Sequence, residues 1–297
     1  MFDLAGALHE RRSDLVEAAP GLVRLRDAVA SPANLRLGTW FQLFGSTLSY
    51  RPSLVLELGR GLGNSTTVFT AAAARLPATR VVSVGYDGRQ AWKHKTAPKL
   101  RSLVDDRFFE CLDVRHADIR DVDFAAVVGD APRVLLWWDA HGDDLAEFVL
   151  GELLPILEER EALVGVHDIS DARYDNPTAA YVREDGLPNF WMADLVGPFE
   201  ELRSLFDFLS RNRIDYATPQ RSLGAMRESD KTAWHELDDA LGPEAADALR
   251  DGGWIYFELD GAAVFPRYTR DVNAPIEGEP TGAVARVRSL AAGVLGR

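Results

Sequence analysis

The sequence predicts an α/β fold with a doubly wound sheet of parallel strands and helices on both faces. Two observations support this prediction. From residue 53 onward, short apolar runs rich in β-branched residues alternate with longer amphipathic stretches, as in βα units. The first of these runs passes through a glycine-rich turn directly into an alanine-rich helix, and such turns bring bare backbone against a bound ligand.

The residues before this alternation have a helical pattern. Residues 2–30 repeat apolar side chains at helical spacing, and we expect the helix to break at Pro20. Residues 34–50 predict a further helix that ends before Arg51-Pro52. We therefore expect residues 1–50 to form an N-terminal helical cap against the α/β core.

The predicted core spans residues 51–169 and contains five βα units. We expect strands at 54–58, at 80–86, within 108–117, at 133–138 and at 162–166. Helices are expected at 65–75, 90–104 and 143–159. Because a strand that returns to its sheet through a helical crossover runs parallel to the strand before it, this order predicts a parallel sheet.

The C-terminal part is expected to add a lid and to complete the sheet. Residues 170–230 are polar and aromatic by turns, which indicates a lid-like insert. Residues 231–297 hold a helix, followed by strands expected at 254–259 and 262–265 around an Asp-Gly turn. We expect this hairpin to be antiparallel.

The glycine-rich turn has the sequence Leu-Glu-Leu-Gly-Arg-Gly-Leu-Gly-Asn-Ser-Thr. Glu57 ends the preceding apolar run, and glycines follow at alternate positions: Gly59, Gly61 and Gly63. Asn64 and Ser65 then offer caps for the helix. A dinucleotide-binding turn would have a glycine as its sixth residue, where this chain has Asn64. A tight turn that binds no ligand is the structural alternative.

The spacing Glu-x-Gly-x-Gly-x-Gly resembles the first motif of the class I S-adenosylmethionine-dependent methyltransferases. The Gly-Asn-Ser-Thr continuation is similar to that of small-molecule O-methyltransferases, in particular the metal-dependent branch that modifies antibiotics and sugars. The resemblance covers residues 50–170 well and the C-terminal hairpin more loosely. It implies a Rossmann-like fold, S-adenosylmethionine as the cofactor and O-methylation of a small molecule.

The resemblance also implies roles for residues along the cofactor. The loop backbone, with Asn64 and Ser65, would lie near the methionine carboxylate, and Glu57 would reach the cofactor directly or through water. Asp87 would bind the ribose hydroxyls. Because Tyr86 stands beside it, the position that corresponds to the ribose-binding acid stays open by one residue. Asp118 would meet the adenine amino group, a role for which Asp113 competes. The structural alternatives are a turn cap for Glu57 and a plain Asp-Gly turn for Asp87.

Acids and histidines follow the fourth and fifth predicted strands, and the carboxyl ends of such strands are where ligands bind. We expect Asp139, His141 and His167 to be the catalytic residues, which orient a substrate hydroxyl and accept its proton. A hydrogen bond to backbone is the structural alternative for each histidine. Residues 170–230 would close over the acceptor.

A metal site is a second expectation at these strand ends. In metal-dependent relatives, acids at these positions hold magnesium, and here Asp139 and Asp168 stand there. Ile169 replaces an asparagine of the catechol-type enzymes, and His167 replaces an acid of the antibiotic branch, so the third oxygen ligand is missing or lies elsewhere. A histidine with two acids suits a transition metal better than magnesium.

Composition limits the partners. The net charge of −13 and the absence of a basic cluster disfavour nucleic acid as a substrate. Cys111 is the only cysteine, which excludes an internal disulfide and a cysteine-based zinc site. The first residues lack a secretory pattern, and no apolar run approaches the ~20 residues of a membrane span, so we expect a cytoplasmic protein. The oligomeric state stays open, a homo-oligomer included.

Two other functions compete with methyl transfer. An NAD(P)-dependent oxidoreductase is disfavoured by Asn64 and by the lack of a Tyr-x-x-x-Lys pair. A non-catalytic protein that binds an adenosyl ligand is disfavoured because the strand-end acids are present.

Overall fold

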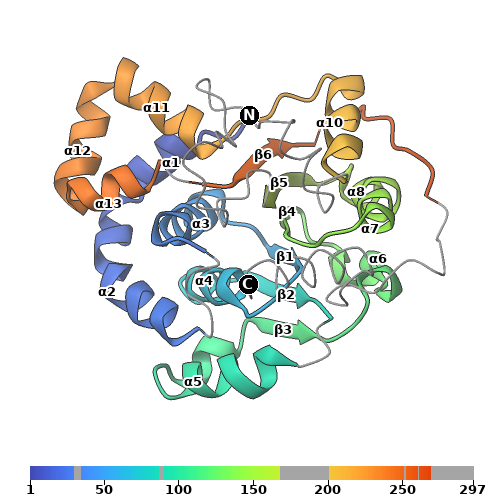
Figure 1. Cartoon of the computed structure of the whole chain (residues 1–297), viewed down its shortest axis with the longest axis horizontal. Helices are drawn as coiled ribbons and strands as arrows, with labels where there is room; N and C mark the ends of the chain where they lie inside the picture. Colours follow the sequence, from blue (N-terminus) through green and yellow to red (C-terminus); the bar gives the residue numbers. More distant parts are fainter. Residues whose placement is uncertain (30–34, 87–89, 168–200, 251, 260, 269–297) are drawn as a thin grey trace, which may run out of the picture.

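The computed structural model describes residues 1–29, 35–86, 90–167, 201–250, 252–259 and 261–268. Asp87, Asp168 and residues 170–200 of the predicted insert lie outside this part of the chain. The described residues form one six-stranded sheet between two groups of helices (Figure 1).

The sheet has the strand order β3-β2-β1-β4-β5-β6. In chain order the strands are β1 (Leu54–Leu58), β2 (Arg80–Val84), β3 (Leu112–Arg115), β4 (Arg133–Trp138), β5 (Glu161–His167) and β6 (Trp254–Glu258). Strands β1 to β5 are parallel, and β6 is antiparallel to β5. The predicted Rossmann-like α/β class is confirmed. The order reverses between β1 and β4, the switch point at which ligands of such sheets bind.

Side chains of β1 alternate between two apolar clusters, one on each face of the sheet. Leu54, Leu56 and Leu58 pack into one cluster, and Val55 packs into the other. Since successive strand residues point to opposite faces, Glu57 shares the face of Val55. A central parallel strand that is apolar on both faces needs helices on both faces.

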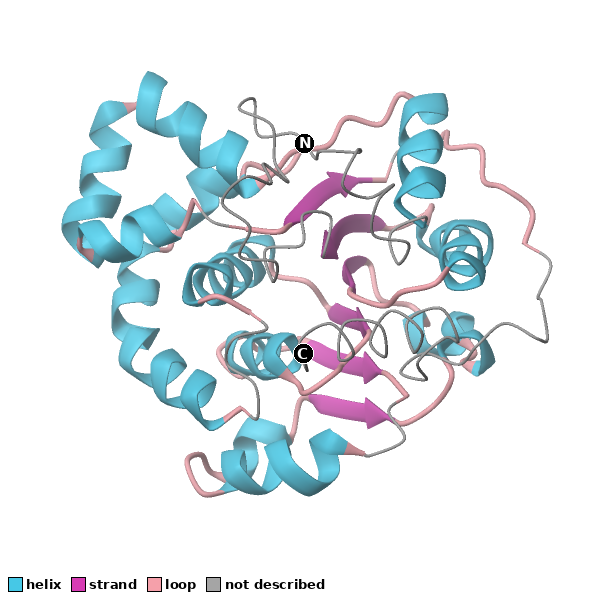
Figure 2. Ribbon diagram, in the orientation of Figure 1, coloured by secondary structure: helices cyan, strands magenta, loops and turns pink. Residues whose placement is uncertain are grey.

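Helices cover both faces (Figure 2). The face of Val55 is covered by α1 (Leu4–Glu10), α2 (Arg12–Ala28), α3 (Leu37–Tyr50), α4 (Asn64–Ala73), α11 (Pro219–Ser229), α12 (Lys231–Leu241) and α13 (Pro243–Ala248). The opposite face is covered by α6 (Phe124–Val128), α7 (Asp143–Phe148), α8 (Leu154–Leu157) and α10 (Glu201–Asn212).

Shorter helices connect these elements: η1 (Trp92–Thr96) and α5 (Ala97–Arg101) after β2, η2 (Asp106–Phe109) before β3, η3 (Ile119–Asp121) after it, and η4 (Val149–Leu153) between α7 and α8. Among the described residues, no helix has both the length and the apolar character that crossing a membrane requires.

The break predicted at Pro20 is wrong. Helix α2 continues through Pro20, and the interruption comes earlier, at Arg11 between α1 and α2. Pro20 removes the hydrogen bond to the carbonyl of Val16, and both side chains are exposed, so water can solvate that carbonyl. Burial of Leu15 and Leu22 on the other side of α2 stabilises the uninterrupted helix.

The C-terminal strand is antiparallel as predicted, but residues 262–265 do not pair with it as a strand. The outer edge of β6 bonds instead to Ala217, whose N–H and C=O both pair with Tyr256 at 2.9 Å. Residues 262–265 are held by α10, where Asn212 bonds both backbone groups of Val264. Contacts with α10 thus replace the second half of the hairpin.

Candidate functional site

The glycine loop follows β1 at the carboxyl edge of the sheet. Gly59, Gly61 and Gly63 all have left-handed backbone, with φ of 93°, 50° and 88°. A Cβ on Gly59 would lie 2.1 Å from the carbonyl oxygen of Asp139, and one on Gly63 would lie 2.3 Å from the Trp92 ring. A Cβ on Gly61 would meet no heavy atom of the described chain within 4 Å. Gly59 and Gly63 therefore allow Asp139 and Trp92 to pack closely against the loop, whereas Gly61 leaves bare backbone facing open space.

Side chains on both sides hold this loop. The Arg60 guanidinium, whose residue is only 4% exposed, donates to the carbonyls of Ser83, Gly85 and Arg115 at 2.9, 3.0 and 3.1 Å. On the other side, Thr96 Oγ1 of η1 donates to the carbonyl of Leu62 at 2.7 Å. Hydrogen bonds from Arg60 and Thr96 thus hold the loop from both sides.

Helix α4 begins directly after the loop, at Asn64, and its N-cap is Gly63, which has no side chain to bond the first backbone N–H groups. Asn64 and Ser65 are both buried in the first turn. A helix N-terminus of this kind favours a carboxylate or a phosphate.

Glu57 is fully buried and bonded to α4. Its two carboxylate oxygens accept hydrogen bonds from Ser65 Oγ and Thr66 Oγ1, both at 2.5 Å. Burial raises the pKa of Glu57, while hydrogen bonds from Ser65, Ser83 and Thr66 and the charge of Arg60 oppose that rise. This geometry supports the alternative in which Glu57 holds the first turn of α4, and its contact with a cofactor stays a prediction.

The ends of β4 and β5 bring two of the expected catalytic residues together. Trp138 pairs with Val166 in the sheet, so the next residue on each strand, Asp139 and His167, are neighbours. His167 Nδ1 lies 2.9 Å from Asp139 Oδ1, and the side chains are 10% and 22% exposed. The Trp137 ring lies 5.5 Å from the imidazole. An imidazole oriented by a carboxylate can accept a proton from a substrate hydroxyl.

His141 and the metal site have less support from the geometry. His141 is exposed, in the loop between β4 and α7. Within the described residues, no group of three or more His, Cys, Asp or Glu side chains is placed to hold a metal ion. Asp168, the second expected ligand, lies outside that part of the chain. Metal binding stays a prediction.

Asp118 is buried, and its carboxylate is bonded by Arg120 through Nε at 3.0 Å and Nη2 at 2.7 Å. Arg120 also contacts Asp144 of α7, and the hydrogen bond to Asp118 is the main reason that the pKa of Arg120 is raised. The competing Asp113 is half exposed and pairs with Arg115. The role of Asp118 toward adenine stays a prediction.

Two features of this edge were not anticipated from the sequence. The motif Glu-x-Gly-x-Gly-x-Gly leaves Arg60 as a variable position, although an arginine inside such a turn is itself a signal. Tyr86 and His116, just after β2 and β3, stack with ring centroids 4.9 Å apart. Their contact depends on how the ends of β2 and β3 align in the sheet, which the sequence does not show.

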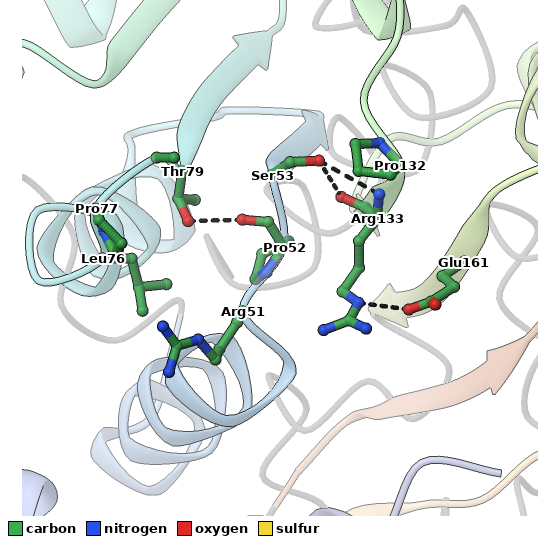
Figure 3. A pocket seen from close by; sticks show the side chains of 10 residues that line it. Arg51, Pro52, Ser53, Leu76, Pro77, Thr79, Pro132, Arg133 and Glu161 are labelled. Atoms are coloured by element: carbon green, nitrogen blue, oxygen red, sulfur yellow. Dashed lines mark hydrogen bonds and ion pairs between the residues drawn. The ribbon is translucent and has the colours of Figure 1, made fainter.

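A cavity of about 300 Å³ lies elsewhere (Figure 3). It is lined by Arg51, Pro52, Ser53, Leu76, Pro77, Ala78, Thr79, Pro132, Arg133 and Glu161. Arg133 and Glu161 are the first residues of β4 and β5, so this cavity is at the amino edge of the sheet. Since ligands of doubly wound sheets bind at the carboxyl edge, the glycine loop remains the candidate site.

No family model matches the chain, and a search of curated proteins found no match. Solved structures do resemble it. An O-methyltransferase of tomaymycin synthesis from Streptomyces achromogenes, in complex with S-adenosylmethionine, is 13% identical over 80% of this chain and 89% of that chain, with a TM-score of 0.47. An O-methyltransferase from Bacillus cereus in complex with S-adenosylhomocysteine is 11% identical over 85% and 90%, with a TM-score of 0.44.

A methyltransferase from Podospora anserina with bound S-adenosylhomocysteine is 14% identical over 71% of this chain and 81% of that chain, with a TM-score of 0.43. At these identities and TM-scores the likeness is distant and carries no argument about activity.

Proposed function

We propose that this protein is an S-adenosylmethionine-dependent methyltransferase that methylates a hydroxyl of a small molecule. The observation that carries the proposal is the contact between the glycine loop and Asp139, because the Cβ position of Gly59 lies 2.1 Å from the Asp139 carbonyl oxygen. A ligand on this loop therefore lies next to the Asp139–His167 pair. A donor and an acceptor can meet there.

The residues of the loop fit the proposed cofactor. Gly61 offers bare backbone facing open space, and the buried first turn of α4 can receive the methionine carboxylate. When bound, S-adenosylmethionine supplies a methyl group on a positively charged sulfur. The chain contributes alignment of the two reactants and exclusion of water.

The Asp139–His167 pair would accept the proton of the substrate hydroxyl. Asp139 Oδ1 faces the imidazole at Nδ1, 2.9 Å away, and we assign acceptance of the hydroxyl proton to this ring. The carboxylate of Asp139 stabilises the positive imidazolium that forms. Deprotonation turns the hydroxyl into a nucleophile for in-line displacement at the methyl carbon.

The charge of the protein supports a small acceptor. A chain with a net charge of −13 repels nucleic acids and other polyanions over most of its surface. An uncharged or weakly charged small molecule meets no such barrier.

The described residues do not by themselves provide a magnesium site. Asp139 Oδ1 is already bonded to His167, and magnesium prefers a shell of several oxygen ligands. We therefore propose the imidazole of His167 as the group that accepts the proton.

Calorimetric titration tests the proposal. We expect S-adenosylmethionine to bind the purified full chain with or without magnesium, and NAD(P) not to bind. Binding of a nicotinamide cofactor in place of S-adenosylmethionine would overturn the proposal. Binding of S-adenosylmethionine without transfer to any of a panel of phenols, sugars and polyketides would favour an adenosyl-ligand sensor.

A further inference from the structure

Arg60 connects the glycine loop to the ends of two other strands. Its side chain turns back under the loop, where its guanidinium donates to the carbonyls of Ser83 and Gly85 at the end of β2 and of Arg115 at the end of β3. These bonds join residues that are 23, 25 and 55 positions apart in the chain. A planar guanidinium with five N–H donors can bind three carbonyls at once, which an ammonium group does with poorer geometry.

The backbone around Arg60 is packed as closely as its side chain. A Cβ on Gly85 would lie 2.9 Å from the backbone nitrogen of Arg60, so an alanine at residue 85 would force this backbone to shift. The following residue of the loop is Gly61, the glycine that faces open space. The position of Gly61 therefore depends directly on how Arg60 is held.

We propose that Arg60 is a positioning residue that fixes the loop for the cofactor, an inference that rests on the proposed function. A loop that is already fixed loses little conformational entropy when a ligand binds, so the affinity for the ligand is higher. Arg60 acts through the backbone of Gly61 and touches no reacting atom. Its loss should affect cofactor affinity more than the rate of transfer.

The charge of Arg60 has a second effect on the loop. It opposes the rise in the pKa of Glu57 that burial causes. An ionised Glu57 is the better acceptor for the Ser65 and Thr66 hydroxyls at the start of α4. Both ends of the loop are thus stabilised by one side chain.

The test compares Arg60→Lys and Arg60→Ala with Arg80→Ala as a matched control. Arg80 also donates to backbone carbonyls, those of Val127 and Val128, but at the amino end of β2. We expect Arg60→Lys to raise both the Kd and the KM for S-adenosylmethionine about tenfold, while kcat at saturating cofactor stays within about threefold. Arg80→Ala should leave both constants unchanged.

Two further measurements separate positioning from a general loss of stability. Gly85→Ala forces the Arg60 backbone to shift and should raise the KM for S-adenosylmethionine in the same way. If Arg60→Ala does not fold, Gly85→Ala and Arg60→Lys together test whether Arg60 positions the loop. Low-millimolar guanidinium should restore part of the affinity of Arg60→Ala, whereas ammonium should not.

The outcomes distinguish the two proposals. If the wild-type protein binds S-adenosylmethionine and the Arg60 and Gly85 variants bind it equally well at a lower melting temperature, Arg60 is only structural and this inference is wrong. If the wild-type protein does not bind S-adenosylmethionine, the proposed function fails and this inference fails with it.

Discussion

The backbone of Gly59 lies against the carbonyl group of Asp139, and a Cβ on residue 59 would lie 2.1 Å from that oxygen. The preceding peptide adds a hydrogen bond, because the Asp139 N–H donates to the carbonyl of Leu58 at 2.8 Å. The glycine loop and Asp139 are therefore packed directly against each other.

Alanine substitutions at the first two glycines of the loop should affect stability and cofactor binding to different extents. Gly59→Ala must displace the Asp139 peptide and should cost about 3 kcal/mol of stability. Gly61→Ala meets no such obstacle and should cost only about 1 kcal/mol, the strain of its left-handed backbone. We expect Gly61→Ala to fold yet bind S-adenosylmethionine about tenfold more weakly. Urea unfolding and calorimetry measure the two effects, and unchanged affinity in Gly61→Ala would place the ligand elsewhere.

Asp139→Asn should separate binding from catalysis. The neutral amide cannot stabilise an imidazolium, so we expect kcat to fall about 100-fold or more while the Kd for the cofactor changes little. Asp106→Asn, at an aspartate whose side chain is 94% exposed, is a suitable control. Turnover that persists in Asp139→Asn would show that the strand-four acid is not catalytic.

Chelation should have little effect on the reaction if the histidine is the base. We expect turnover to survive EDTA and to fall about 100-fold in His167→Gln. Loss of activity with EDTA and recovery with magnesium would favour a metal held by Asp139 and Asp168 instead.

Glu57 should make stability depend on pH. Because burial raises its pKa, the folded chain binds this proton more tightly than the unfolded chain does. The stability that the group contributes is complete below the ordinary pKa of 4.5 and is lost as the pH rises through the higher pKa of the folded state. Relative to Glu57→Gln, wild type should lose stability from about pH 4.5 upward. A pH-independent difference in urea unfolding would contradict this.

The parts of the fold that depend on local pattern could be predicted from the sequence. The apolar run at Leu54–Leu58, the glycine spacing and the strand-end residue Asp139 all follow from alternation and turn chemistry. The position of His167 at the end of the next strand follows from the same alternation, whereas its direct contact with Asp139 is a finding of the structure.

Features that depend on distant partners could not be predicted. The bonds of Arg60 need the exact placement of carbonyls on two other strands. Likewise, residues 262–265 could form a hairpin strand by local pattern alone, but Ala217 takes the edge of β6 and Asn212 binds Val264. The bonds of Arg60 and the conformation of residues 262–265 therefore depend on contacts with residues far away in the chain.

The pairing of β1 has a consequence for biosynthesis. Leu54 bonds on one side to the strand that starts at Arg80 and on the other to Val134, far along the chain. A ribosome that has made the glycine loop must translate past Asp139 before Gly59 gains its packing surface. During synthesis and refolding alike, competence to hold a ligand should therefore arise late, after most of the sheet has assembled.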